Sequence, residues 1–334
     1  MPKRKFPRYS LSLLLVGLAA HSTHAGELIA FSPAAKALAV AEREDKIRVV
    51  DADTGKPKWS QDVFGLTVGA KTTPLKSISA VAFAPDGKTL AVGGGVLYHG
   101  HVALFETASG KLLHVVRDVG RSDFVVLAFS PDSKTVSAGA RFGPAFLFDV
   151  GTSERKRMFE TKGLTAVAFA GDGTLVAGAC VNENNSDHIK RDVKIWNTET
   201  GKVVHTIPEA RGPVALNADG KLLAAFQGER SLALWDVGTE KAKRVLGDIA
   251  GKRRVVQLAF SPDARLLAVI EEDAKAERQE VFLWRTDTGA RLSKVADGPS
   301  VHVSFSADGR TLHVATAKGV QNVDLAQILH PRRQ

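Results

Sequence analysis

The sequence contains very few of the residues that covalent and redox chemistry use most often. Cys180 is the only cysteine in 334 residues, so the chain cannot form an internal disulfide bond. We expect Cys180 to be a small buried residue on a strand rather than a reactive thiol. Only four tryptophans and two tyrosines are present, which leaves little material for an aromatic cofactor site.

Long hydrophobic runs are also absent beyond the N-terminus. A transmembrane helix needs about 18 or more consecutive apolar residues, and no such run occurs there. The chain is 44% hydrophobic and 24% charged and has no polar low-complexity tract, so we expect most of it to fold.

The N-terminal segment has the pattern of an export signal. Basic residues between Lys3 and Arg8 precede a short apolar run from Leu11 to Ala20, and Ala25 offers a cleavage point before Gly26. An uncleaved anchor helix is the alternative. We expect residues 1–25 to be a signal peptide, residues 26–334 to form one folded domain, and the protein to be periplasmic in a Gram-negative-type cell.

The charge balance is basic but modest. The net charge is +9, and four of the 45 lysines and arginines lie in the expected signal, so the excess beyond it is smaller still. These charges are spread along the chain, which does not indicate a nucleic acid partner. We expect protein partners in the cell envelope and no transmembrane span after removal of the signal.

A repeated motif determines the expected fold. Phe-Ser/Ala-Pro-Asp-Gly followed by Lys/Arg-x-Leu occurs seven times, intact or degenerate, at spacings of 40 to 52 residues. Units of this length are typical of propeller blades rather than helical repeats. The copies begin at Phe31, Phe83, Phe129, Phe169, Leu216, Phe260 and Phe305, and the repeats start near residues 28, 77, 124, 164, 213, 255 and 301.

Each unit has the residue pattern of a four-stranded blade. An apolar strand such as Ala80–Phe83 leads to an Asp-Gly turn at Asp86, because this pair supplies a side-chain hydrogen bond and a positive φ. A second apolar strand follows at Thr89–Val92, and third strands alternate as Val193–Trp196 does. A Thr-Gly type turn then precedes a weaker fourth strand. The prediction is an all-β chain with a single seven-bladed β-propeller of four-stranded antiparallel blades.

The last blade is expected to be incomplete. The final repeat runs through Gly319–Asp324 and leaves only Ala326–Leu329 for a fourth strand. When the two termini of a propeller share one blade, no sheet edge is left open. Here the first repeat already begins with its own innermost strand, so the N-terminus has no strand to add to the last blade. We therefore expect the ring to close mainly by side-chain packing of blade seven on blade one.

The third strands carry the resemblance to a known family. Their ends at Trp196-Asn197, Trp235-Asp236 and Trp284-Arg285 resemble those of WD40 repeats, and the resemblance covers about residues 27 to 330. The Gly-His pair of eukaryotic WD repeats is missing before every first strand, and Gly100-His101 sits elsewhere. The chain thus looks like the looser, bacterial exported type. The resemblance implies a non-catalytic protein- or ligand-binding scaffold without a cofactor.

Two enzyme classes remain as alternatives. DADTGKPKW, residues 51 to 59, resembles the repeat of quinoprotein dehydrogenases, an oxidoreductase class whose blades each dock a tryptophan on the next blade. Trp59 has no aromatic counterpart in the other repeats, so we expect it to pack between blades. A lactonase-like hydrolase would need acidic and His groups around the central channel. No catalytic sequence motif supports either enzyme.

Three second-to-third-strand loops and one insert are expected on a common face of the ring. They are Gly93–Gly100, Val181–Asp192, Glu271–Glu280 and the insert Phe64–Ser77. Length variation on one face is typical of an interaction surface on a rigid scaffold, and drift in exposed loops is the alternative.

Polar residues expected on this common face are the candidate partner-binding residues. A His-x-His pair and an Asp-His pair could hold a metal if their loops converge, although solvated histidines are the default and we assign no metal or catalytic residue. The arginines could bind an anionic ligand, a peptide or the envelope surface, with ordinary surface charge as the alternative. The candidates are His99, His101, Asp187, His188, Arg191, Arg253 and Arg254.

Overall fold

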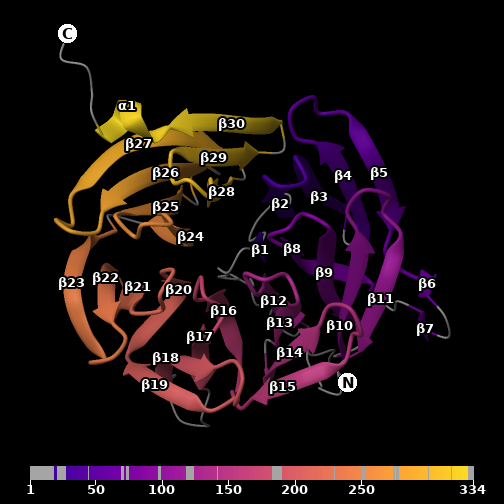
Figure 1. Ribbon diagram of the computed structural model, residues 1–334, viewed down its shortest axis with the longest axis horizontal. Coiled ribbons are helices and arrows are strands. Elements are labelled where there is room, and N and C mark those ends of the chain that lie inside the picture. The colour runs from indigo at the N-terminus through magenta and orange to yellow at the C-terminus, as the bar shows by residue number, and fades with distance from the viewer. Residues whose placement is uncertain are drawn as a thin grey trace, which may run out of the picture.

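The computed structural model shows a ring of antiparallel sheets around a central axis (Figure 1). Seven sheets follow one another in sequence order, and within each repeat the first strand lies innermost. The predicted seven-bladed propeller is therefore confirmed. The described residues are 19–20, 28–43, 45–68, 71–72, 75–96, 99–117, 124–140, 142–182, 190–228, 230–249, 253–273, 275, 278–299, 301–316 and 318–329.

Six blades have four consecutive antiparallel strands, and the seventh has three. The strands of blades one to three are β2 (Leu28–Ser32), β3 (Ala37–Arg43), β4 (Lys46–Asp51), β5 (Pro57–Asp62); β8 (Ser77–Phe83), β9 (Thr89–Val96), β10 (His99–Glu106), β11 (Leu112–Arg117); and β12 (Phe124–Phe129), β13 (Thr135–Ala140), β14 (Ala145–Asp149), β15 (Arg155–Phe159). Blades four and five contain β16 (Leu164–Phe169), β17 (Leu175–Asn182), β18 (Lys190–Asn197), β19 (Val203–Pro208); and β20 (Ala210–Leu216), β21 (Leu222–Gln227), β22 (Ser231–Asp236), β23 (Lys241–Asp248). Blades six and seven contain β24 (Arg253–Phe260), β25 (Leu266–Asp273), β26 (Arg278–Arg285), β27 (Arg291–Gly298); and β28 (His302–Phe305), β29 (Thr311–Thr316), β30 (Gly319–Asp324).

The core lies in the seams between blades. Side chains alternate along a strand, so each inner strand supplies one set of residues to the seam on each side. In β12, Leu127 and Phe129 pack toward blade two, whereas Val126 and Ala128 pack toward blade four. Because both faces of the blade are covered, the inner strands read as continuous apolar runs. Burying each large apolar side chain contributes about 1.5 to 3 kcal/mol.

The repeated Ser-Pro/Ala-Asp sequence builds the turn after the innermost strand. Ser130 Oγ donates to Asp132 Oδ1 at 2.6 Å, and the same carboxylate oxygen accepts the backbone N–H of Lys134 at 3.0 Å. The hydrogen bond from Ser130 lowers the pKa of Asp132. Ser261-Asp263 and Ser306-Asp308 repeat the 2.6 Å contact, so the motif specifies the same turn in three blades.

Trp59 joins blade one to blade two, as predicted. Its indole Nε1 donates to the Thr107 carbonyl at 2.8 Å, and its ring centroid lies 6.0 Å from that of Phe105. Gly110 is needed beneath it, because a Cβ there would lie 2.6 Å from the indole ring and φ is +73°. The preceding Asp51 accepts hydrogen bonds from Thr54 Oγ1 and N–H, which form the turn. Trp59 therefore has a packing role.

The ring closes by side-chain packing of blade seven on blade one, as expected. Phe31 and Val40 of blade one are clustered with Ala315 and Val320 of blade seven. The rings of Phe31 and His313 meet edge to face at 5.6 Å. The remaining candidate for a fourth strand, Ala326–Leu329, is part of the helix α1 (Leu325–Leu329), which lies at the outer edge near β27 and β30 (Figure 1).

The predicted signal peptide falls almost entirely outside the described residues. Within it, only the strand β1 (Ala19–Ala20) is described, and it pairs antiparallel with β8 through Ala82 and Val81. No helix among the described residues is long and apolar enough to cross a membrane.

Candidate functional site

Antiparallel connectivity gives the ring two different faces. Connections within a blade from the first to the second strand and from the third to the fourth emerge on one side, which we call the turn face. Second-to-third connections and the links between blades emerge on the other side, which we call the loop face. Those predicted partner-binding residues that the structure describes belong to the ends of strands on the loop face.

Two of the predicted loops are shorter than expected because the strands extend into them. The segment Gly93–Gly100 is mostly strand, since β9 continues to Val96 and β10 begins at His99. His99 and His101 are therefore β10 residues, and His101 is buried at 7% exposure. The segment Glu271–Glu280 likewise contains the ends of β25 and β26. The prediction that these histidines lie in a loop was wrong, because both lie in β10.

The described strands of the insert Phe64–Ser77 lie at the rim. Its two short strands, β6 (Thr67–Val68) and β7 (Lys71–Thr72), form a small hairpin, and β6 lies beside β11, the outermost strand of blade two (Figure 1). Asp187 and His188 fall outside the described residues. A metal site formed by the His-x-His and Asp-His pairs is therefore not described, and no group of three or more metal-ligating residues occurs in the described ranges.

The three predicted arginines do meet, in a cavity of about 410 Å³ on the loop face. Arg191 is near the start of β18 in blade four, and Arg253 and Arg254 begin β24 in blade six. Arg211 from β20 and Arg230 from the short β21–β22 connection complete the set. We call this cavity, with its five arginines, the arginine pocket.

The floor of the arginine pocket is apolar. Phe226, Ile249 and Val255 line it and are 6%, 4% and 1% exposed. Cys180 lies in the same lining and is 2% exposed, as expected for a small buried residue. Burial raises the pKa of the Cys180 thiol to about 12, and the neighbouring Asp192 adds to this effect. The thiol is therefore protonated at neutral pH and contributes packing.

Blade six neutralises part of the positive charge. Arg253 Nη1 lies 2.6 Å from Glu280 Oε2 and 3.3 Å from Glu271 Oε2, and Arg254 pairs with Glu272. Burial alone would lower the pKa of Arg253, but its hydrogen bonds and attraction to Glu271 and Glu280 raise it. Glu271 is the buried centre of this network.

Arg291 completes the support around Glu271. Its Nη2 lies 3.0 Å from Glu271 Oε1, and its guanidinium stacks 3.6 Å from the centroid of the Phe282 ring. The carboxylate is therefore held between two guanidinium groups, one on the pocket side and one toward the outer strand. This arrangement compensates the cost of burying its charge.

Blades four and five carry the more accessible positive charge. Arg191 and Arg230 are both exposed, and neither forms an ion pair with any residue that the structure describes. Arg211 lies between them in partial burial. Arg191 and Arg230, which form no ion pair with a described residue, therefore place exposed positive charge on the blade-four and blade-five side of the arginine pocket.

Sequence reasoning missed Arg211 and Arg230. Arg230 lies in a very short connection, and Arg211 in an innermost strand, so a search of long loops passes over both. The usable signal was the repeat itself: Arg211 in β20 and Arg254 in β24 lie near the same end of equivalent strands.

The central channel holds a second cavity of about 360 Å³, with a mainly apolar lining. Phe169, Phe260 and Phe305 of three blades line it together with Pro131 and Pro262 of the turns. Gln257, one of its polar residues, is already used, because Nε2 donates to the Val303 carbonyl at 3.1 Å and Oε1 accepts the Val303 N–H at 3.2 Å. The described lining offers binding surface rather than convergent titratable groups.

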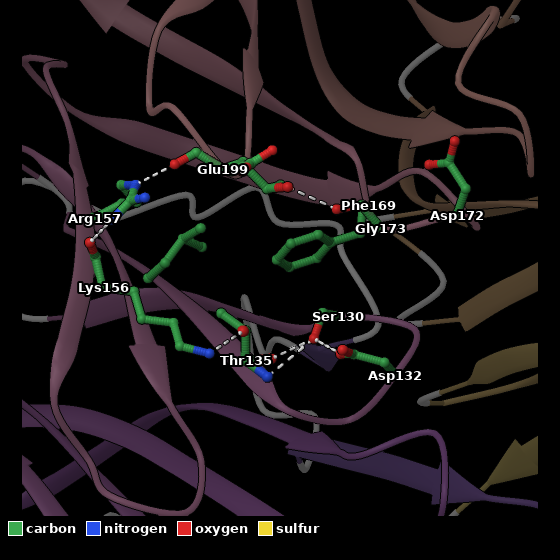
Figure 2. Close-up of a pocket in the computed structure, with 11 residues that line it drawn as sticks. Ser130, Asp132, Thr135, Lys156, Arg157, Phe169, Asp172, Gly173 and Glu199 are labelled. Carbon is green, nitrogen blue, oxygen red and sulfur yellow. Dashed lines mark hydrogen bonds between the residues drawn. The ribbon is translucent and has the colours of Figure 1, made fainter.

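A third cavity, of about 390 Å³, lies between blades three and four on the turn face (Figure 2). Its polar groups serve the turns: the Ser130 and Asp132 contacts are those of the repeated turn, and Thr198 Oγ1 donates to the Gly173 carbonyl at 2.8 Å. Lys156 pairs with Asp149 at 2.9 Å, and this hydrogen bond lowers the pKa of Asp149 to about 2. The side-chain groups of Ser130, Asp132, Thr198 and Lys156 in this seam are therefore used by the chain's own structure.

His302 is a buried titratable group at the loop-face end of the ring. It begins β28, at the loop-face end of blade seven, and is 1% exposed. Neither ring nitrogen has a hydrogen-bond partner among the described residues. Burial lowers the pKa of His302 to about 4, so the ring is neutral at pH 7.

Comparison with known proteins gives WD-repeat relatives at low identity. No family model matches the sequence. The chain is 26% identical over 142 residues, 41% of its length, to the WD repeat-containing protein SL1-17 of Schistosoma mansoni, and covers 44% of that protein. It is 22% identical over 223 residues, 63% of its length, to the target of rapamycin complex subunit wat1 of Schizosaccharomyces pombe, and covers 65% of it.

A third relative is much longer than the aligned segment. The periodic tryptophan protein 2 homolog of Dictyostelium discoideum is 23% identical over 217 residues, and the match covers 62% of this chain and 22% of that protein. The chain thus spans less than two thirds of the length of each relative. Together with the seven-bladed ring, these matches identify the fold as a WD40-like propeller.

Proposed function

We propose that this WD40-like β-propeller is a non-catalytic scaffold that binds a protein partner through its loop face. The observation that carries the proposal is the arginine pocket, where charged side chains from three blades surround an apolar floor. The rigid ring holds these side chains in place, and they are not part of the repeated turn motif. An apolar centre with polar groups around it is the usual anatomy of a binding surface.

The relatives support protein binding as the general activity. One relative is, by its name, a subunit of a target of rapamycin complex, and its homology covers 63% of this chain. A propeller that serves as a subunit needs a stable ring and a complementary surface. Nothing in the described channel favours the hydrolase or oxidoreductase alternative over this activity.

The finer part of the proposal is the location. The basic, apolar and small-residue pattern of residues 1–25 supports export to the periplasm, so the partner would be a protein of the cell envelope. The test is the N-terminal sequence and the compartment of the chain expressed in a Gram-negative cell. A periplasmic protein starting at Gly26 is expected, and a cytoplasmic protein that retains residues 1–25 would contradict the export proposal.

Partner capture tests the proposed face. The bait is the chain from Gly26 onward, and an envelope extract of the source cell supplies the partners. One variant replaces residues 183–189 and 274–277, in two second-to-third connections, with short Asn-Gly turns. The control variant changes the exposed turn-face residues Lys221 and Arg265 to Glu. Loss of specific proteins with the first variant alone is expected; equal recovery with both would contradict a loop-face scaffold.

A further inference from the structure

We propose that the arginine pocket receives a short acidic segment of the partner and buries one of its apolar side chains. This inference rests on the proposed scaffold function and names the chemistry that the partner presents. Three features carry it: the size of the cavity, the position of the accessible arginines, and the carboxylates that confine the positive charge.

The cavity has the dimensions of an anchor site. Its volume of about 410 Å³ is at the small end of ligand pockets, which range over about 300 to 1,000 Å³. Phe226, Ile249 and Val255 offer a preformed apolar floor that is already packed from beneath. A single leucine or phenylalanine side chain could therefore be buried there without rearrangement of the blades.

The arginines select carboxylates beside that anchor. Guanidinium groups present a planar fork of donors that matches a carboxylate with two parallel hydrogen bonds. Arg191 and Arg230 project from different blades and are exposed, so acidic residues on either side of the anchor could reach them. The pocket thus combines an apolar hole with cationic groups at its edge.

The neighbouring carboxylates limit the ligand to a short segment. Glu271, Glu272 and Glu280 of blade six lie against Arg253 and Arg254. A long polyanion such as a nucleic acid would have to pass these negative groups, whereas a brief acidic stretch would contact only the blade-four and blade-five side. Nucleic acid binding also favours an extended basic stripe, which this compact pocket does not provide.

The test is binding of a fluorescent peptide of about ten residues, with glutamates on both sides of one leucine, followed by anisotropy. Two matched peptides replace the glutamates with glutamine or the leucine with glycine. The protein variants are the double change of Arg191→Glu and Arg230→Glu, and a control with Arg155→Glu and Arg265→Glu, which has the same net charge but lies away from the pocket.

We expect the pocket variant to weaken binding of the acidic peptide by about tenfold or more and the control by less than about twofold. The glutamine peptide should lose a similar factor, and the glycine peptide about three- to tenfold. A double variant with Arg191→Lys and Arg230→Lys keeps the charge, so it should show an intermediate affinity if the guanidinium fork matters. Thermal melts of all variants check that the ring is folded.

Several results would overturn the inference. Equal weakening in the pocket and control variants would mean that only overall charge matters, and unchanged binding of the glutamine or glycine peptide would remove one of the two recognition elements. Binding of a single-stranded oligonucleotide that is tighter than peptide binding and equally sensitive to the pocket variant would replace the peptide with a nucleic acid. If the acidic peptide does not bind but partner capture still depends on the loop face, this inference is wrong and the proposed scaffold function is retained.

Discussion

The turn-face cavity between blades three and four and the arginine pocket on the loop face are similar in volume, about 390 and 410 Å³, but their polar groups are used differently. At the turn face, Ser130 and Asp132 form hydrogen bonds that recur in other blades, so the repeat itself accounts for them. At the loop face, Arg191 and Arg230 belong to no recurring motif. The repeated motif therefore accounts for these polar groups of the turn-face cavity, whereas the exposed arginines of the loop-face pocket are available to contact a partner.

The largest expected effect concerns the support beneath the arginine pocket. We expect Glu271→Ala to lower the free energy of unfolding by about 3 kcal/mol, because two guanidinium groups lose a buried carboxylate. The partial exposure of Arg253 and Arg291 keeps the loss from being larger. Urea unfolding measures it, with the exposed Glu154→Ala as the control, expected within about 0.5 kcal/mol.

The Glu271→Ala variant also tests how far blade six neutralises the positive charge of the arginine pocket. Without Glu271, Arg253 is less neutralised, so the acidic peptide should bind the folded Glu271→Ala variant a few times more tightly. Weaker binding by a variant whose melt is still cooperative would show that Glu271 does not limit the positive charge of the pocket.

His302 gives the next largest effect, through pH. Its folded pKa of about 4 lies below the ordinary 6.5, so the unfolded chain takes up the proton first as pH falls. The stability is therefore fully present above pH 6.5 and is lost toward pH 4, by about 2 kcal/mol at pH 5. His302→Leu should remove this slope in urea melts from pH 8 to 5. An unchanged slope would show that another group titrates.

The smallest of the three effects tests the turn face. Ser130→Ala removes a hydroxyl that donates to Asp132 and accepts the Thr135 N–H, so we expect a loss of about 1 kcal/mol. The exposed Ser293→Ala is the control. Binding of the acidic peptide should not change with Ser130→Ala. If this substitution weakened peptide binding as much as the pocket variant, the two faces would not be functionally distinct.

Repetition made the fold predictable from sequence, because seven copies of one turn motif locate the first and second strands of every blade. The same copies could not show how far β9 and β10 extend, so His99 and His101 were predicted as loop residues. Arg191 was found because it lies in a long connection, and Arg253 and Arg254 were found because they continue a basic run from Lys252. Arg211 and Arg230 were missed because the curvature of the ring brings residues of three blades together in one pocket. A local sequence pattern does not predict this curvature.

The central claim, that a protein partner occupies the loop face, is tested most directly by site-specific photocrosslinking in the intact cell. A photoreactive amino acid replaces Gln227, which is exposed next to Phe226 of the arginine pocket, or Lys221, which is exposed on the turn face. The account predicts a discrete crosslinked product from position 227 that disappears when Arg191 and Arg230 are changed to Glu, and none from position 221. Crosslinks from position 221 alone, or products at 227 that survive the arginine changes, would contradict it.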